Sequence, residues 1–446
     1  MSEAAATMAE GGYRRARTLL AELETTVDGA HAWLRLAEAY THLGAHDAAA
    51  RCAGAAVEAA PEDPDACYAL ATAQTVLGRF AEAEALFDRV IALRSNDWDA
   101  WANRSTLRPV RPDRNHVDAL EQAYASNTDA EARIALGYAL AHELEGLGYH
   151  SEAWPYLAGA ARLRRGRLSY RVEGDVETMS ALRAAFTPER LAGVRMETGA
   201  PGPIFIFGLP RSGTTLVDRI LAAHREVASL GEIPDFVQAL VRAHPGVRDK
   251  NALIAASVAM DHRALGEAYR RRVAEYDAPR AFTVDKTPLN FLYAGLIALA
   301  LPEARIVHVR RGAMDSGYAM LKTLFRMGYP FSYDLDDLAA YRIAFEALMA
   351  HWHAAMPGRI VEIGYEALVA DQEGQSRRLL AACGLDWDPA CLAFHASTAP
   401  VATASAAQVR NPIHDRSVGL WRHHAEALEP LATALTRAGV ALEALP

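Results

Sequence analysis

The sequence predicts a chain in two parts, in which an all-α array of helical repeats precedes an α/β domain with a parallel sheet. With 446 residues the chain exceeds what one hydrophobic core usually holds. The first 170 residues are alanine-rich with helical periodicity, whereas from residue 203 strand-like runs alternate with helices. We therefore expect a repeat domain at residues 1–170, a linker helix region at 171–202 and the α/β domain at 203–446.

The repeats are visible as a spacing in the first part of the chain. Seven positions, with a glycine between two helices, recur 34 residues further on: Trp33, Leu36, Tyr40, Gly44, Ala49, Ala56 and Pro61 return as Cys67, Leu70, Gln74, Gly78, Ala83, Val90 and Ser95. This period is typical of a tetratricopeptide solenoid.

Other units of the array are less regular. LRPVRPD at 107–113 interrupts a third unit that begins at Trp98, because proline breaks a helix. A further unit is recognisable from Gly148, and residues 11–28 are predicted to be the second helix of an incomplete first unit. Such an array presents a concave surface that commonly binds an extended peptide; the alternative, that it only stiffens or dimerises the protein, stays open.

Composition and charge limit the function classes. Hydrophobic residues make up 51% and charged residues 23% of the chain, as in ordinary globular proteins. The net charge of -9 argues against a nucleic-acid partner. Because no run approaches about 18 apolar residues and no signal peptide is visible, we expect no membrane span and a cytoplasmic location. The four cysteines are scattered without metal-ligand spacing, so we predict no metal site.

The second part opens with a candidate phosphate loop. FIFGLPRSGTTL, residues 205–216, runs from an apolar strand through a glycine loop into a helix. Gly208 and Gly213 have the spacing of a P-loop, but Thr214 follows where a nucleotide triphosphatase has lysine. Backbone N–H groups of residues 211–215 and the hydroxyls there would surround a phosphate at the helix N-terminus. The predicted cradle consists of Arg211, Ser212, Gly213, Thr214 and Thr215.

A second strand end favours an anion over a metal ion. ARIVHVRR, residues 304–311, ends in two arginines where a nucleotide triphosphatase places the carboxylate that holds magnesium. 3′-Phosphoadenosine 5′-phosphosulfate fits this pattern, because it offers one phosphate to the loop and another to Arg311. Its sulfuryl group transfers with little charge, so cations and N–H groups suffice without metal. Arg211 can neutralise the 5′-phosphate as it leaves.

Four motifs extend this interpretation. PRSGTTL (210–216), DKTPLNFLYAGLIALALPEARIVHVRR (285–311), GYEAL (364–368) and SAAQVRNPI (405–413) occur in this order. The chain resembles, over roughly residues 203–430, the bacterial sulfotransferases with N-terminal tetratricopeptide repeats, and more distantly the tyrosylprotein sulfotransferases. The resemblance implies a P-loop-like fold, a 3′-phosphoadenosine 5′-phosphosulfate donor that leaves as 3′,5′-ADP, and a hydroxyl acceptor. A protein or peptide acceptor, tyrosine included, could be held by the repeats.

The resemblance also implies roles for individual residues. Glu232 matches the glutamate that takes the acceptor's proton, with its register off by about one residue. Lys286 and Ser405 match residues that stabilise the transferring sulfuryl group, and Arg211 completes the catalytic set. His224 and Asp285 stay open as rival bases. The implied donor-binding set is Arg211, Ser212, Gly213, Thr214, Thr215, Arg311, Tyr365, Ser405 and Arg410.

Two positions depart from the family pattern. Ala319 replaces a serine and Leu420 a basic residue, and each change removes a phosphate contact. Two alternatives therefore stay open beside a sulfotransferase: a non-catalytic tetratricopeptide adaptor with a degenerate nucleotide domain, and a P-loop kinase. The sequence does not identify the acceptor or the oligomeric state.

Overall fold

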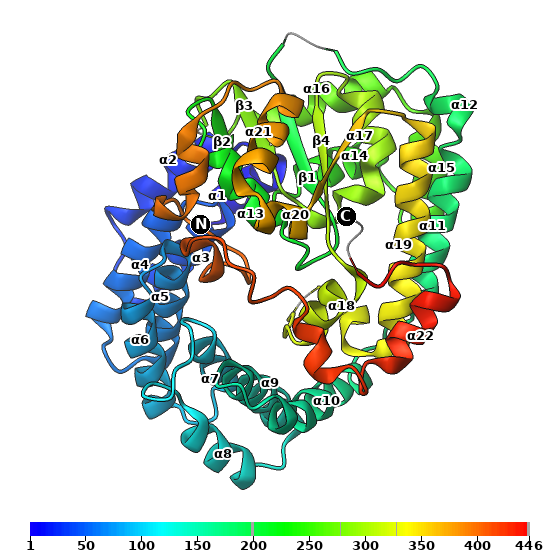
Figure 1. Cartoon of the computed structure of the whole chain (residues 1–446). Helices are drawn as coiled ribbons and strands as arrows, with labels where there is room; N and C mark the ends of the chain where they lie inside the picture. Colours follow the sequence, from blue (N-terminus) through cyan, green and yellow to red (C-terminus); the bar gives the residue numbers. More distant parts are fainter. Residues whose placement is uncertain (198–199, 277, 327, 444–446) are drawn as a thin grey trace. The chain divides into compact units, whose positions relative to one another are not determined.

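The computed structural model describes all residues except 198–199, 277, 327 and 444–446 (Figure 1). The chain divides into two compact units. The first comprises Met1–Leu168 with two later segments, Lys322–Arg326 and Thr398–Arg410, and the second comprises the rest. Two segments that the sequence analysis places in the second domain therefore group with the repeats. Among the described residues, no helix combines the length and the apolar character needed to cross a bilayer.

The first unit is built from helices joined by short turns. Gly44, Gly78 and Gly148 lie in three of these turns with φ of 66°, 77° and 87°, a region that glycine enters without steric penalty. Helix α2 lies within the predicted segment 11–28, and a helix of nine residues, α1, precedes it. The helices are α1 Ser2–Glu10, α2 Tyr13–Glu24, α3 Ala30–His42, α4 His46–Ala59, α5 Pro64–Leu77, α6 Phe80–Leu93, α7 Trp98–Ser105, α8 Val117–Ser126, α9 Ala130–Gly146 and α10 His150–Gly166.

Small residues let the helix pairs of the first unit pack closely. Cys67, Ala71 and Ala83 are fully buried around Phe87, and all four positions belong to one hydrophobic cluster of α5 and α6. A larger side chain at these crossings would separate the helices. The repeat core is therefore narrow, as the alanine-rich sequence predicts.

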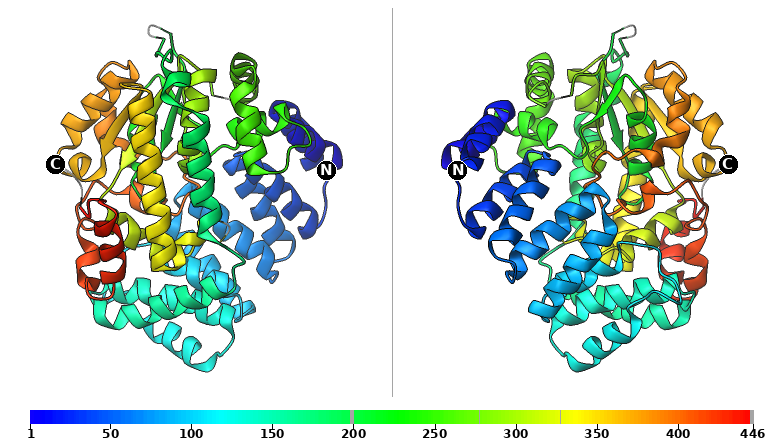
Figure 2. Two further views of the ribbon diagram at one scale, coloured as in Figure 1. Left: turned by 90° about the vertical axis from the view of Figure 1, so that its right-hand side faces the viewer. Right: turned by 90° about the vertical axis from the view of Figure 1, so that its left-hand side faces the viewer.

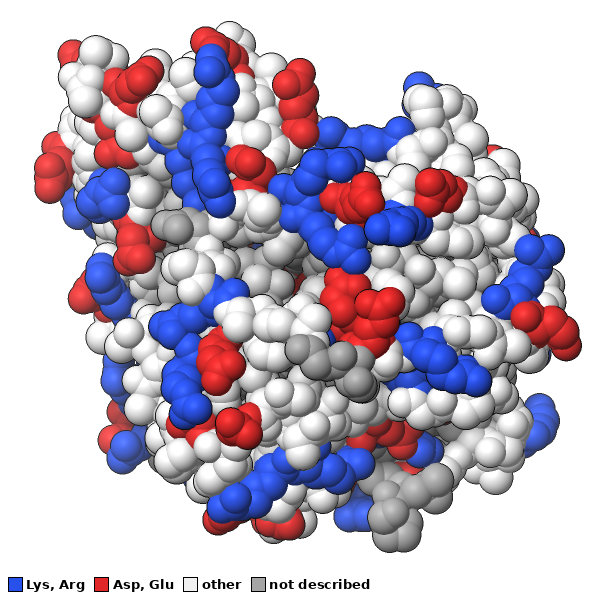
Figure 3. All heavy atoms as spheres, turned by 90° about the horizontal axis from the view of Figure 1, so that it is seen from above, with Lys and Arg blue, Asp and Glu red and all other residues white. Residues whose placement is uncertain are grey.

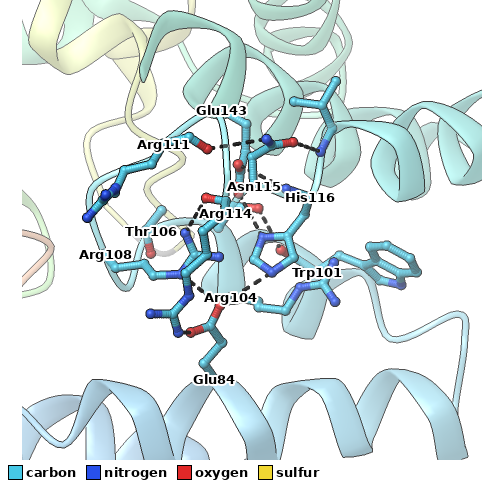
Figure 4. Close-up of polar contacts among 12 residues, drawn as sticks. Glu84, Trp101, Arg104, Thr106, Arg108, Arg111, Arg114, Asn115, His116 and Glu143 are labelled. Atoms are coloured by element: carbon cyan, nitrogen blue, oxygen red, sulfur yellow. Dashed lines mark hydrogen bonds and ion pairs between the residues drawn. The ribbon is translucent and has the colours of Figure 1, made fainter. Parts of the chain in front are cut away.

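The interrupted third repeat is held by ionic contacts in place of a helix (Figure 4). Glu84 of α6 accepts hydrogen bonds from Arg108 at 2.8 Å and Arg114 at 2.5 Å, and lies 3.4 Å from the His116 imidazole. Nδ1 of His116 is 2.9 Å from Glu143 of α9. The prolines end α7 early, and this network fixes the loop that follows.

The second unit contains a five-stranded parallel sheet in the order β2-β3-β1-β4-β5 (Figures 1 and 2). In the register of the central strands, Phe207 pairs with His308, and His308 pairs with Glu362. The strands are β1 Pro203–Phe207, β2 Val227–Ser229, β3 Phe282–Asp285, β4 Arg305–Arg310 and β5 Ile360–Gly364. The predicted fold class, a tetratricopeptide solenoid followed by an α/β domain with a parallel sheet, is confirmed.

Helices cover both faces of the sheet. On one face, Ile204 and Ile206 of β1 share a core with α13, α21 and the 3-10 helix η3 (Pro389–Ala396). On the other, the Phe205 ring lies 5.9 Å from Phe236 of α14 and 5.3 Å from Tyr269 of α16, measured between ring centroids. The helices of the second unit are α11 Val172–Ala185 and α12 Pro188–Leu191 in the predicted linker region, then α13 Thr214–Ala222, α14 Asp235–Ala243, α15 Lys250–Ala259, α16 His262–Val273, α17 Ala294–Ala300, α18 Ala313–Leu321, α19 Leu335–Ala355, α20 Tyr365–Ala370, α21 Gln372–Cys383 and α22 Glu429–Arg437.

Short 3-10 helices connect several of these elements: η1 Pro288–Tyr293, η2 Pro330–Tyr333, η3 Pro389–Ala396, η4 Gln408–Arg410 and η5 Leu420–His424. Charges of both signs are distributed over the face shown in Figure 3, where acidic side chains lie between groups of basic ones. On this face neither sign forms a continuous surface of the kind that binds a polyanion.

Candidate functional site

The glycine loop lies at the carboxyl end of β1 and leads into α13. Gly213 has a φ of 102°, a backbone conformation that favours glycine. A Cβ at this position would also lie only 2.6 Å from the ring of Tyr365, so both the backbone conformation and the close contact require a glycine. Arg211 also adopts a left-handed backbone, with a φ of 65°. An L-residue pays about 1–2 kcal/mol for this conformation, a strain that proteins concentrate at functional sites.

The loop offers polar groups to a ligand at the N-terminus of α13. Ser212 is 2% exposed, and its hydroxyl has no hydrogen-bond partner among the described residues. Thr214 and Thr215 are buried beside it in the first turn, where backbone N–H groups lack an intrahelical acceptor. The N–H of Ser212 instead donates to the Leu209 carbonyl at 3.2 Å, so it does not contribute to the predicted cradle. The remaining groups fit a phosphate.

Arg311 meets this loop directly, although the two are far apart in the sequence. It follows β4 and is 7% exposed. Its Nη1 donates to the Arg211 carbonyl at 2.9 Å, and Nη2 donates to the Ser417 carbonyl at 2.6 Å. Its guanidinium lies 4.6 Å from the centroid of the Tyr365 ring, and the Tyr365 hydroxyl is 2.8 Å from the Ser417 hydroxyl. Sequence reasoning missed Ser417, which lies three residues before Leu420.

Two guanidinium groups therefore share one region. Burial and, to a smaller extent, the positive charge of the neighbouring Arg311 together lower the pKa of Arg211 to about 10. The Nε of Arg311 has no hydrogen-bond acceptor within the described part of the chain. An anion bound here would relieve the repulsion between the two cations and satisfy this donor.

A second charged group follows the end of β3. Lys286 is 1% exposed and forms an ion pair with Glu232, whose side chain is 41% exposed. Asp218 of α13 is a second carboxylate that interacts electrostatically with Lys286. Burial raises the pKa of Asp218, and the positive charge of Lys286 lowers it. Sequence reasoning missed Asp218; the only signal was an acidic residue within an otherwise apolar helix face. Lys286 thus interacts with one buried and one accessible carboxylate.

The carboxyl of Asp285, a rival base, is turned into the protein interior. It is fully buried and accepts hydrogen bonds from Thr287 at 2.8 Å, Asn290 at 3.1 Å and Tyr269 at 3.3 Å. Burial raises its pKa to about 7. These partners assign Asp285 to fixing the end of β3, and an acceptor hydroxyl has no access to it.

His224, the other rival, is also engaged. It is 2% exposed, and Nε2 lies 3.0 Å from the Asp386 carbonyl. Nδ1 accepts a hydrogen bond from the Glu226 N–H at 3.1 Å. Both ring nitrogens thus connect loops of the second unit, which leaves Glu232 as the accessible carboxylate.

Ser405 and Arg410 lie in the segment Thr398–Arg410 of the first unit. The Val401 N–H donates to the Val76 carbonyl at 2.9 Å, and Arg410 donates to the same carbonyl at 3.4 Å. The Arg410 guanidinium packs against Gly78, where a Cβ would overlap it. The structure thus brings residues 211–215, Arg311 and Tyr365 together, and ties Arg410 to the repeats.

The repeats also hold a second segment of this chain. A cavity of about 440 Å³ in the first unit is lined partly by Leu324 and Arg326. Arg326 forms an ion pair with Asp99, and Lys322 forms one with Glu145. The segment Lys322–Arg326 is therefore held against α7 and α9 of the first unit.

Comparisons with known proteins follow the same division. Residues 203–389 match the sulfotransferase family, and residues 30–63 and 47–103 match tetratricopeptide repeats. An uncharacterised protein of Aquifex aeolicus is 30% identical over 80% of this chain and 48% of its own length. The protein-tyrosine sulfotransferase of Drosophila melanogaster is 24% identical over 42% of this chain and 39% of its own length. The chain thus spans about half, or less, of these relatives.

Among solved structures, the sulfotransferase domain from the curacin biosynthetic pathway is similar. It is 16% identical with a TM-score of 0.33, and the match covers 52% of this chain and 99% of that domain. The family matches confirm the resemblance that the four motifs predict. This chain therefore joins tetratricopeptide repeats to a domain of the sulfotransferase family.

Proposed function

We propose that the chain transfers a sulfuryl group from 3′-phosphoadenosine 5′-phosphosulfate to a hydroxyl acceptor. One observation carries the proposal: the guanidinium of Arg311 donates to the backbone of Arg211 within the glycine loop, so two cations meet at one phosphate cradle. A doubly phosphorylated adenosine supplies the two anionic groups that such a pair requires. Ala319 lies buried on α18 and offers no hydroxyl, so 3′-phosphate binding rests on Arg311.

The donor, when bound, supplies a sulfuryl group whose bond to the 5′-phosphate oxygen is readily broken. Ser212 and the first turn of α13 bind the 5′-phosphate, and Arg211 neutralises the charge that grows on it as this bond breaks. Arg311 binds the 3′-phosphate, and Tyr365, held between Gly213 and Arg311, fixes the shape of the cradle.

Glu232 takes the proton of the acceptor hydroxyl as the acceptor oxygen forms its bond to sulfur. Lys286 stabilises the negative charge on the sulfuryl oxygens, and its ion pair with Glu232 keeps both groups in place before reaction. Transfer is in line, and no metal is needed for these steps.

A protein or peptide is the acceptor class that the relatives favour. Two relatives that match at low identity are protein-tyrosine sulfotransferases, which favours a tyrosine hydroxyl in a protein or peptide. The repeats would hold that peptide beside their own segment Lys322–Arg326.

The four cysteines are buried and form no disulfide, which favours the reducing cytoplasm.

Calorimetry with 3′,5′-ADP, 5′-AMP and magnesium ATP tests the donor. Tight binding of the bisphosphate alone supports a sulfotransferase. Magnesium-dependent ATP binding supports a P-loop kinase, and absence of binding to any nucleotide supports a non-catalytic adaptor.

Transfer of ³⁵S from labelled donor to host lysate tests the reaction. Glu232→Gln should lower the rate by at least about 10²-fold, the typical contribution of a general base. Glu226→Gln is the matched control, because its side chain is 44% exposed against 41% for Glu232 and lies only six residues away. Equal rates for wild type and Glu232→Gln would refute the proposed base, and label in protein or small molecules identifies the acceptor class.

A further inference from the structure

Three metal-ligating side chains converge on the face of the sheet that α19 covers. His308 lies in β4, Glu362 is its direct partner in the β4–β5 register, and His353 lies near the end of α19. The residues that alternate with His308 and Glu362 along the two strands belong to the core on the opposite face of the sheet: Val307, Val309 and Ile363. One ligand atom from each of the three side chains lies within 4.8 Å of the others.

The imidazoles in this cluster lack ordinary partners. His308 is 2% exposed, with its ring between Phe207 and Phe345 at centroid distances of 6.1 and 5.7 Å. Within the described residues neither ring nitrogen of His308, nor Nε2 of His353, has a hydrogen-bond partner. A buried polar group without a partner is costly and uncommon. A bound ligand would give these nitrogens the partners that they lack.

The carboxylate is placed to share such a ligand. Oε2 of Glu362 lies 3.6 Å from Nδ1 of His308 and 3.6 Å from Nε2 of His353. Its other oxygen, Oε1, accepts a hydrogen bond from Arg310 at 3.2 Å, which fixes the orientation of the carboxylate. Carboxylate oxygens and imidazole nitrogens are both ordinary ligands of zinc.

We propose that His308, His353 and Glu362 form a binding site for one Zn²⁺ ion that joins β4, β5 and α19. Zinc bonds of about 2.0–2.2 Å in tetrahedral geometry place two ligands about 3.3 Å apart. The two distances of 3.6 Å are close to this value, and small side-chain rotations bring the ligands to it. Two imidazoles and one carboxylate leave a fourth position for water.

The surroundings permit entry and suggest a stabilising role. The side chains of His353 and Glu362 are 35% and 40% exposed, so an ion reaches the site from solvent. Arg311 lies three residues beyond His308, so an ion here would hold the strand that positions the proposed 3′-phosphate contact. The ion takes no part in the proposed sulfuryl transfer.

Metal binding to the full chain tests the site. The chain is stripped with a chelator, and equilibrium dialysis against Zn²⁺ and the visible absorption of Co²⁺ are then measured for wild type, His353→Gln and Glu362→Gln. His414→Gln is the matched control, because it removes an exposed imidazole of the same unit. We expect one ion per chain in wild type and in the control, at least about 100-fold weaker binding in both site variants, and a zinc-dependent rise in melting temperature that both lose.

The site is refuted if wild type binds no Zn²⁺ or if His353→Gln and Glu362→Gln bind as tightly as the control. A melting temperature that depends on pH and is unaffected by Zn²⁺ would show that the cluster is an ion pair of protonated imidazoles with Glu362. Both substituted residues are partly exposed, and circular dichroism of each variant checks that it is folded. The wild-type titration decides the question even if a variant fails to fold.

Discussion

Replacing Arg211 separates the backbone strain of the glycine loop from the contribution of the loop to sulfuryl transfer. Arg211→Gly and Arg211→Ala both remove the guanidinium, but only glycine also removes the strain of a Cβ at a φ of 65°. An L-residue in this conformation costs about 1–2 kcal/mol, and glycine loses about 0.5–1 kcal/mol through the greater freedom of the unfolded chain. The glycine variant should therefore be more stable than the alanine variant, by up to about 1.5 kcal/mol.

Both variants also end the repulsion between two neighbouring cations. The pKa of Arg211, lowered to about 10 by burial and by Arg311, shows that its charged form is disfavoured in the fold. Loss of this group should therefore leave the donor-free protein at least as stable as wild type. In contrast, sulfuryl transfer should fall by about 10²–10³-fold, as expected when one preorganised cation is lost.

Thermal and urea unfolding without nucleotide, together with ³⁵S transfer, measure the two effects. For a domain of this size 1 kcal/mol corresponds to about 2–4 °C in melting temperature. Arg248 is the control position, because it is exposed and has a negative φ, so glycine there should be no more stable than alanine. Arg211→Gly that is less stable than Arg211→Ala, or a variant that transfers sulfate at the wild-type rate, would refute the reasoning.

Three further predictions follow from individual contacts. Arg311→Ala should weaken the binding of 3′,5′-ADP by about 10²-fold through loss of charge-assisted hydrogen bonds, while the binding of 5′-AMP, measured by the same calorimetry, stays unchanged. Equal losses of affinity for both nucleotides would contradict the assignment of Arg311 to the 3′-phosphate. Burial raises the pKa of Asp285 from 3.8 to about 7, so the folded state binds the extra proton and stability should fall as pH rises from about 4 to 7, by about 4 kcal/mol at most. Asp285→Asn should flatten this pH profile of unfolding, and an unchanged slope would count against it. Glu84→Ala leaves Arg108 and Arg114 without their shared carboxylate. The free energy of unfolding of the repeats, measured in urea, should fall by about 3–5 kcal/mol, or by less to the extent that solvent screens the partly exposed Arg114. A loss below about 1 kcal/mol would show that solvent replaces the network.

Local sequence was sufficient for the elements themselves. The 34-residue spacing fixes helix pairs because each repeat buries the same small residues, and the turn glycines have the positive φ that the pattern requires. The glycine loop was equally legible, since a strand, a loop and a helix N-terminus are consecutive along the chain. Proline placement likewise located the end of α7.

Contacts between distant segments could not be predicted in the same way. The sequence showed that Arg311 ends a strand, but not that it would donate to Arg211 and to Ser417, because this depends on β4 lying beside β1. The segment Lys322–Arg326 carries no motif that assigns it to the repeats; its ion pairs with α7 and α9 exist only in the folded chain.

The histidines of residues 351–353 illustrate the limit most clearly. Residues two apart on an α-helix point to different faces, so His351 and His353 of α19 diverge, and Nε2 of His351 lies 2.7 Å from the Phe186 carbonyl. The sequence thus determined that these two histidines share no ligand, and it predicted no metal site. Only the strand order decided that His353 would meet His308 and Glu362, because parallel strands become neighbours through the topology of the sheet and not through their spacing in the chain.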